Sequence, residues 1–65
     1  MPKYPQIKVK LVGQDGNAFL IMGLVQQAMR KAKLTKEQID EYLKEAMSGD
    51  YDNLLFVTQQ YVNVE

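Results

Sequence analysis

The chain has 65 residues, 46% of them hydrophobic, and its eight basic residues balance eight acidic ones. This length predicts one domain, residues 1–65, and the hydrophobic share is sufficient for a core and too high for a disordered tail. Because there is neither Cys nor His, disulfides, zinc sites of those ligands and nucleophile–histidine pairs are excluded, and we expect no enzyme, no cofactor and no bound metal.

An alternation of apolar and charged residues predicts the first strand. The apolar positions are Ile7, Val9 and Leu11, and the charged positions between them are Lys8 and Lys10. A period of two places one side of the strand in the core and the other in water. The turn-forming residues 13–17 end this strand.

Two structures are compatible with the segment after the turn. In the first, Asn17 caps a helix whose apolar residues recur at three- and four-residue steps. These residues are Ala18, Ile21, Met22, Val25, Ala28, Met29 and Ala32. In the second, Asp15-Gly16 forms a hairpin turn, residues 18–22 return as a strand, and the helix begins near Gly23. The helical spacing extends over fifteen residues, which favours the first structure.

The sequence Thr35-Lys36-Glu37-Gln38 is a capping box and predicts the start of a second helix. Its inward residues are Ile39, Tyr42, Leu43, Ala46 and Met47. Ser48-Gly49 ends it, and Asp50 or Asp52 caps a third element.

The third element is ambiguous, because Phe56-Val57-Thr58 is locally typical of a strand. The helical spacing of Tyr51, Leu54, Leu55, Thr58, Tyr61 and Val62 favours a helix over 51–60, followed by a short strand at 61–64. We therefore predict a small α+β domain of order β-α-α-α-β, with two terminal strands packed together under three helices. The alternative is an N-terminal β-hairpin followed by helices.

Two segments are candidates for binding a ligand, because backbone N–H groups at a helix start can hold an anion. Their residues are Gly13, Asp15, Gly16, Asn17, Asp50 and Asp52. Neither segment contains a phosphate-loop, dinucleotide or EF-hand motif. A tight turn and two helix caps explain the same residues without a ligand.

Apolar residues outside the predicted core indicate an interface. On their helices Phe19, Leu20 and Phe56 point away from the core side, and Gly23 permits close approach of another backbone. In so small a protein such a cluster is typical of an interface between copies or with another protein. The alternative is that the first helix is buried nearly all round.

The charges separate along the chain. Residues 1–36 contain seven basic residues and one acidic residue, whereas residues 37–65 contain one basic and seven acidic residues. Arg30, Lys31, Lys33 and Lys36 form a basic corner, but the net charge of zero argues against nucleic-acid binding. The longest apolar runs have five residues and the chain begins directly with the strand pattern, so we expect no membrane span, no secretory signal and a cytoplasmic location.

Three motifs follow one another, with Gly23 and Leu54-Leu55 between them. They are Gly13-x-Asp15-Gly16-Asn17-Ala18-Phe19, Ser48-Gly49-Asp50-Tyr51-Asp52 and Val62-x-Val64-Glu65. With these motifs the chain resembles, over nearly its whole length, a family of short hypothetical proteins of bacteria, phages and mobile elements. Members tend to carry a His after the second aspartate and a Trp near the end, where this chain has Asn53 and Tyr61. The resemblance implies no particular activity, ligand or site residue.

We therefore expect a non-enzymatic protein-interaction module that forms a homodimer or binds another protein. If the resemblance holds, a regulator or inhibitor of a host system, encoded by a phage or mobile element, is one form of such a module. Two alternatives from other classes stay open: a small-ligand or nucleotide-binding protein, and a nucleic-acid accessory protein.

Overall fold

The computed structural model describes residues 2–11 and 17–65. The described elements are β1 (Tyr4–Val9), α1 (Ala18–Lys31), α2 (Lys36–Ala46), α3 (Tyr51–Tyr61) and β2 (Val62–Val64). This order confirms the predicted α+β fold of β-α-α-α-β type. The predicted hairpin turn lies outside the described residues, as do the ligand-loop positions Gly13, Asp15 and Gly16.

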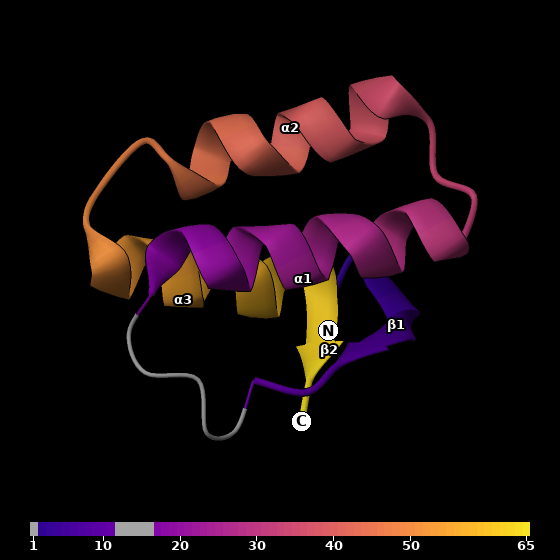
Figure 1. Cartoon of the computed structure of the whole chain (residues 1–65), viewed down its shortest axis with the longest axis horizontal. Helices are drawn as coiled ribbons and strands as arrows, with labels where there is room; N and C mark the ends of the chain where they lie inside the picture. The colour runs from indigo at the N-terminus through magenta and orange to yellow at the C-terminus, as the bar shows by residue number, and fades with distance from the viewer. Residues whose placement is uncertain (1, 12–16) are drawn as a thin grey trace.

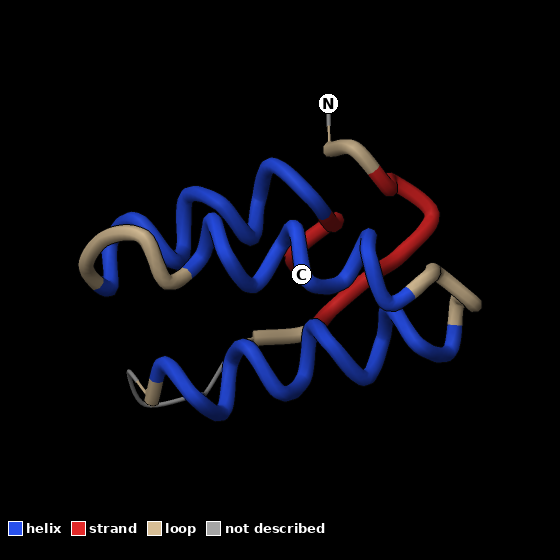
Figure 2. The backbone as a smooth tube through the Cα atoms, turned by 90° about the horizontal axis from the view of Figure 1, so that it is seen from above, coloured by secondary structure: helices blue, strands red, loops and turns tan. Residues whose placement is uncertain are grey.

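The three helices lie above a small sheet (Figure 1). α2 runs across the top, with α1 in front of the molecule and α3 behind it. From above, α2 lies between α1 and α3 (Figure 2). The helices therefore form two tiers, and the strands lie below the lower one.

The two strands pair in parallel, with Tyr4 opposite Val62 and Val9 opposite Val64. The register is irregular between Tyr4 and Lys8. A parallel pair needs a long crossover connection, and here all three helices supply it. The prediction that the terminal strands pair beneath the helices is confirmed.

The start of α1 decides between the two structures that the sequence left open. The Leu20 N–H donates to the Asn17 side-chain oxygen at 3.1 Å, and the Ile21 N–H donates to the Asn17 carbonyl at 3.0 Å. The first bond gives a partner to an N–H group that a helix start otherwise leaves unpaired, and the second is the first i→i−4 bond of the helix. Residues 18–22 are helical, and the alternative with a returning strand is wrong.

The core lies between the sheet and the lower helices α1 and α3, and continues between these two helices and α2. Its apolar members are Ile7, Val9, Ile21, Met22, Val25, Met29, Ile39, Tyr42, Ala46, Leu54, Val57, Tyr61 and Val62. Two predicted inward residues, Ala32 and Met47, are exposed instead. Each is the C-cap residue of its helix, where the backbone leaves the helical path and the side chain no longer continues the buried face.

Candidate interaction surface

The residues predicted to form an interface are exposed. The exposed fractions are 81% for Phe19, 44% for Leu20 and 62% for Phe56. Gly23 is also exposed, and a Cβ atom at this position would meet nothing within 4 Å. The alternative, that α1 is buried nearly all round, is wrong, because the sheet and the other helices leave the side of α1 that carries Phe19, Leu20 and Gly23 exposed.

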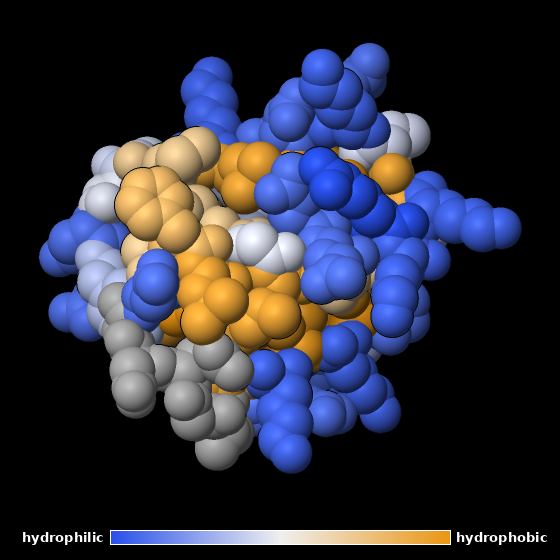
Figure 3. Space-filling view, viewed as in Figure 1, coloured by the Kyte–Doolittle hydropathy of each residue, from blue (hydrophilic) through white to orange (hydrophobic). Residues whose placement is uncertain are grey.

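A groove of about 250 Å³ begins beside Phe19, where the first turn of α1 faces the connection between α2 and α3. Its lining residues are Ala18, Phe19, Met22, Ala46, Met47, Gly49, Asp50, Tyr51 and Leu54. The space-filling view shows apolar side chains gathered over the first half of α1 and the facing end of α2 (Figure 3). A single apolar surface thus spans two elements that are distant in sequence.

Phe56 lies apart from this groove and is not among its lining residues. On α3 the buried positions are Leu54, Val57, Thr58 and Tyr61. By 100° per residue, Phe56 points roughly 150° away from their common direction. Because α1 and α3 face each other through their buried sides, their outer faces diverge, and the structure does not bring Phe56 together with Phe19 and Leu20.

Of the predicted ligand residues that the structure describes, Asn17 and Asp50 serve as helix caps and Asp52 does not. The Asn53 N–H donates to Asp50 Oδ1 at 2.9 Å, just as Leu20 N–H donates to Asn17. Asp52 lies exposed in the first turn of α3. The two capping side chains are therefore already hydrogen-bonded, and Asp50 in addition lines the groove beside Phe19.

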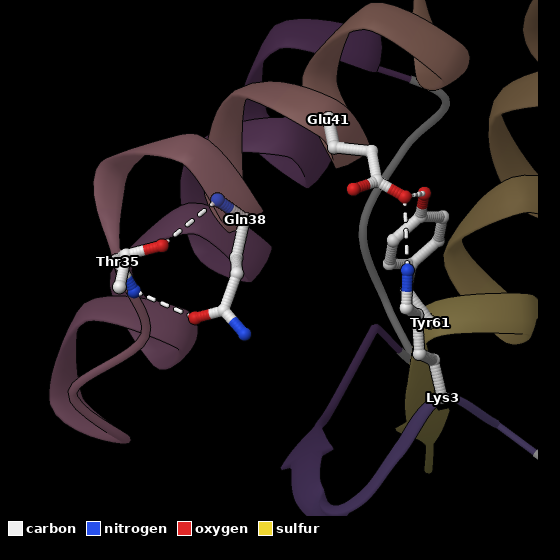
Figure 4. Close-up of polar contacts among 5 residues, drawn as sticks. All are labelled: Lys3, Thr35, Gln38, Glu41 and Tyr61. Atoms are coloured by element: carbon white, nitrogen blue, oxygen red, sulfur yellow. Dashed lines mark hydrogen bonds and ion pairs between the residues drawn. The ribbon is translucent and has the colours of Figure 1, made fainter.

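A polar cluster joins the chain's N-terminal lead to α2 and α3 (Figure 4). Lys3 Nζ lies 2.9 Å from Glu41 Oε1, and the Tyr61 hydroxyl donates to the same oxygen at 3.1 Å. Lys3 Nζ also lies 5.3 Å from the centroid of the Tyr61 ring. The same view shows the capping box of α2, in which Gln38 N–H donates to Thr35 Oγ1 and Thr35 N–H donates to Gln38 Oε1.

The electrostatics of this cluster suit a structural contact. The hydrogen bond from Lys3, followed by that from Tyr61, lowers the pKa of Glu41, and the hydrogen bond to Glu41 raises the pKa of Lys3. Burial, and then the carboxylates of Glu45 and Glu41, raise the pKa of Tyr61. A carboxylate with a lowered pKa is a weak base and a phenol with a raised pKa is a weak acid, so neither shift favours proton transfer near neutral pH.

The predicted basic corner is divided between two sides of the molecule. Arg30 and Lys36 line a groove of about 330 Å³ between α1 and α2, which also contains Asp40. Lys31 lines a different groove with Lys8 of β1 and Lys10, which directly follows β1. The sequence separates these lysines by about twenty residues, and only the packing of α1 against β1 brings them together.

Two features of the surface were not predicted from the sequence. Met47 is 59% exposed and extends the apolar surface beside Phe19. Its position directly before Ser48-Gly49, where the helix ends, is the signal that identifies it as a cap. The contact of Lys3 with Glu41 spans 38 positions, and no local pattern indicates it.

Comparisons with protein-family models, with curated proteins and with solved structures found no match. The resemblance to a family of short phage and bacterial proteins therefore stays a prediction. Among the described residues, the structure contains no helix both long and apolar enough to cross a membrane.

Proposed function

We propose that the chain is a non-enzymatic protein-interaction module that forms a homodimer through the outer face of α1 and acts in the cytoplasm. The observation that carries this proposal is the exposure of Phe19, at 81%, beside the open position of Gly23. Large apolar side chains gathered on the surface of a small domain are typical of an interaction site.

The arrangement of α1 supports a helix-to-helix contact. Phe19 and Leu20 lie one turn before Gly23, and the glycine leaves space for the backbone of a second α1. Burying these side chains from both copies removes on the order of several hundred Å² of apolar surface. At about 25 cal/mol per Å² this contributes several kcal/mol before the cost of association.

The charges favour an antiparallel dimer with Gly23 near its two-fold axis. Arg30 lies seven residues beyond Gly23, or about 10 Å along the helix. In an antiparallel pair it therefore approaches the partner's first turn of α1, where Asp50 lines the groove beside Phe19. A two-fold dimer repeats this basic-to-acidic contact at both ends.

The dimer is tested by light scattering at high micromolar concentration. We expect twice the mass of one chain for the wild type, and a shift towards monomer for Leu20→Ser and for Gly23→Leu, because the latter occupies the space that the partner helix needs. Phe56→Ser is the matched control, since it removes another exposed large apolar side chain, outside the α1 face. A monomeric wild type, or a dimer that only Phe56→Ser dissociates, would refute the proposed interface.

Phe56 remains exposed in this dimer and is available to a second protein partner. If the resemblance to phage and mobile-element proteins is correct, that partner belongs to a host system that the module regulates or inhibits. Pull-down with wild-type protein and with Phe56→Ser tests this part. Retention of the same host protein by both would contradict a role for Phe56.

A small-ligand or nucleotide-binding function is the alternative for the groove beside Phe19. The volume of about 250 Å³ and the carboxylate of Asp50 favour it, although typical ligand pockets are about 300–1,000 Å³. Thermal shift with nucleotides and cationic metabolites distinguishes the two functions. A ligand that stabilises the wild type but not Met22→Ala or Met47→Ala supports the alternative.

A further inference from the structure

The strand β1 has an edge that no described residue of the sheet covers. The sheet has two strands, and β2 occupies one side of β1. The Val9 carbonyl accepts from Glu65 N–H at 2.8 Å, and Leu11 N–H donates to the Glu65 carbonyl at 3.2 Å. Backbone groups alternate sides along a strand, so those of Lys8 and Lys10 point to the opposite edge.

A groove of about 340 Å³ runs between this edge and α1. Its lining residues are Lys8, Val9, Lys10, Leu24, Gln27, Ala28 and Lys31. The second half of β1 and α1 lie side by side in both ribbon views (Figure 1, Figure 2). The groove thus combines hydrogen-bonding backbone groups on one wall with apolar side chains and an amide on the other.

Among the residues that the structure describes, every ionisable side chain lining this groove is a lysine. The ion pair found among the described residues involves Lys3 and Glu41, at the other end of β1. Glu65 follows β2 and is held on the opposite side of β1. The groove is therefore positively charged although the chain as a whole is neutral.

We infer that this edge binds an extended acidic segment of another protein, which adds to the sheet as a third strand next to β1. The partner's backbone bonds to the N–H and C=O groups of Lys8 and Lys10, and its carboxylates lie near the three lysines. A second copy of β1 does not suit this edge, because its lysines would lie next to the lysines of the first copy and repel them. The groove lining includes no aromatic ring on which a nucleic-acid base could stack.

The binding is tested with a fluorescent, acetylated octapeptide in which Glu alternates with Thr, and with the same peptide carrying Lys in place of Glu. We expect the Glu peptide to bind, the Lys peptide not to bind, and affinity to fall as salt rises. In hydrogen exchange followed by NMR, the amides of Lys8 and Lys10 should gain protection when the Glu peptide is added. Binding without that protection would refute strand addition.

Charge-reversal variants locate the site. Lys8→Glu combined with Lys31→Glu should weaken binding of the Glu peptide by about tenfold or more. Lys44→Glu, a single charge reversal on the outer face of α2, should alter that binding by about twofold or less. If a single-stranded oligonucleotide binds to the protein and the Glu peptide does not, the groove is a phosphate site and the proposal is overturned. The proposal is independent of the dimer: Leu20→Ser should bind the peptide as the wild type does.

Discussion

Two glycines show how differently single positions are constrained. Gly23 lies on the outer face of α1 with open space around it, whereas a Cβ atom at Gly49 would lie 2.8 Å from Asn53 Cβ. Asn53 is itself held in place, since its Nδ2 donates to the Glu45 carbonyl at 3.1 Å. Gly49 is thus required by close packing, and Gly23 is not required by the fold of one chain.

We therefore expect Gly23→Ala to stabilise the monomer. Alanine in a helix interior is favoured over glycine by about 1 kcal/mol, and no neighbour opposes the added methyl group. Urea unfolding at low protein concentration measures the change. Gly49→Ala is the control and should destabilise, because Asn53 must move; equal effects of the two substitutions would contradict this explanation.

The buried hydroxyl pair in the core is a second feature at this scale. Thr58 Oγ1 donates to the Leu54 carbonyl at 2.8 Å and lies 2.7 Å from the Tyr42 hydroxyl, so the tyrosine donates to the threonine. Burial raises the pKa of Tyr42, and Thr58 is fully buried. The Tyr42 hydroxyl therefore depends on Thr58 for its hydrogen bond, whereas Thr58 also has the Leu54 carbonyl as a partner.

Removing the hydroxyl of Tyr42 and removing that of Thr58 should lower the free energy of unfolding by different amounts. Tyr42→Phe deletes the donor and leaves Thr58 bonded to Leu54, a loss of about 1 kcal/mol. Thr58→Val leaves the Tyr42 hydroxyl buried without a partner, which costs about 1–3 kcal/mol. Denaturant unfolding of both variants checks the order, and a larger loss for Tyr42→Phe would contradict the proposed direction of donation.

Among the secondary-structure elements, α1 ends in a left-handed backbone conformation that the sequence does not predict. Lys33 has a φ of 64°, the left-handed region in which glycine is usual at a helix end. Leu34 N–H donates to the Met29 carbonyl at 3.1 Å, which closes the last turn. After this bend the chain enters the capping box of α2. A lysine therefore occupies the position at which helices with a left-handed end usually have a glycine.

Lys33→Gly should therefore stabilise the protein by up to about 1 kcal/mol, since it removes the steric cost of the left-handed conformation. Thermal and urea unfolding measure the gain. Lys31→Gly, two residues earlier and within α1, should destabilise by a similar amount. A loss of stability in Lys33→Gly would show that the side chain of Lys33 itself contributes.

The cluster that ties the N-terminal lead to α2 and α3 predicts a defined pH dependence. The pKa of Glu41 is lowered in the folded chain. The stability that its carboxylate contributes is therefore fully present above the ordinary pKa of 4.5 and is lost as the pH falls through the lowered pKa. Tyr61 has the opposite effect at alkaline pH, because its pKa is raised in the folded chain. The stability that its protonated hydroxyl contributes is fully present below pH 10.0 and is lost as the pH rises through the raised pKa. Unfolding midpoints followed from acid to neutral pH should fall less steeply on acidification in Glu41→Gln than in wild type.

At the scale of the whole molecule, size limits stability. The folded surface is 4452 Å², against roughly 10,900 Å² for the unfolded chain, so about 60% is buried on folding. That fraction is at the low end for a domain without disulfides or metals. Part of the apolar content remains outside the core, at Phe19, Leu20 and Phe56, where association can bury it.

If α1 forms the dimer interface, stability should depend on protein concentration. Association favours the folded state by mass action, so the melting temperature of the wild type should rise with concentration, and that of Leu20→Ser should stay constant. Differential scanning calorimetry over a hundredfold concentration range makes the measurement. A melting temperature independent of concentration in the wild type would mean that the folded chain is monomeric.

The spacing of residues along the chain leaves open whether residues 18–22 form a helix or a strand, and whether Asp50 or Asp52 caps α3. It predicts the β-α-α-α-β order, the caps at Asn17 and Thr35, and the outward direction of the exposed aromatic residues Phe19 and Phe56 and of Leu20. These features depend on residues within about four positions of one another, because helix caps and helix faces are local. The cap positions Ala32 and Met47 were placed wrongly, since helical periodicity alone does not indicate where the backbone leaves the helix.

Which of these local features come into contact depends on how the helices and strands pack together. This packing joined Phe19 to Met47 and Asp50 in one groove, separated Phe56 from them, and placed Lys31 beside Lys8 and Lys10 along an open strand edge. Such contacts link residues far apart in the chain, and they follow from how the apolar sides of all the elements pack at once. Because no spacing within a single element encodes that packing, the charged groove and the shape of the apolar surface could not be derived from the sequence.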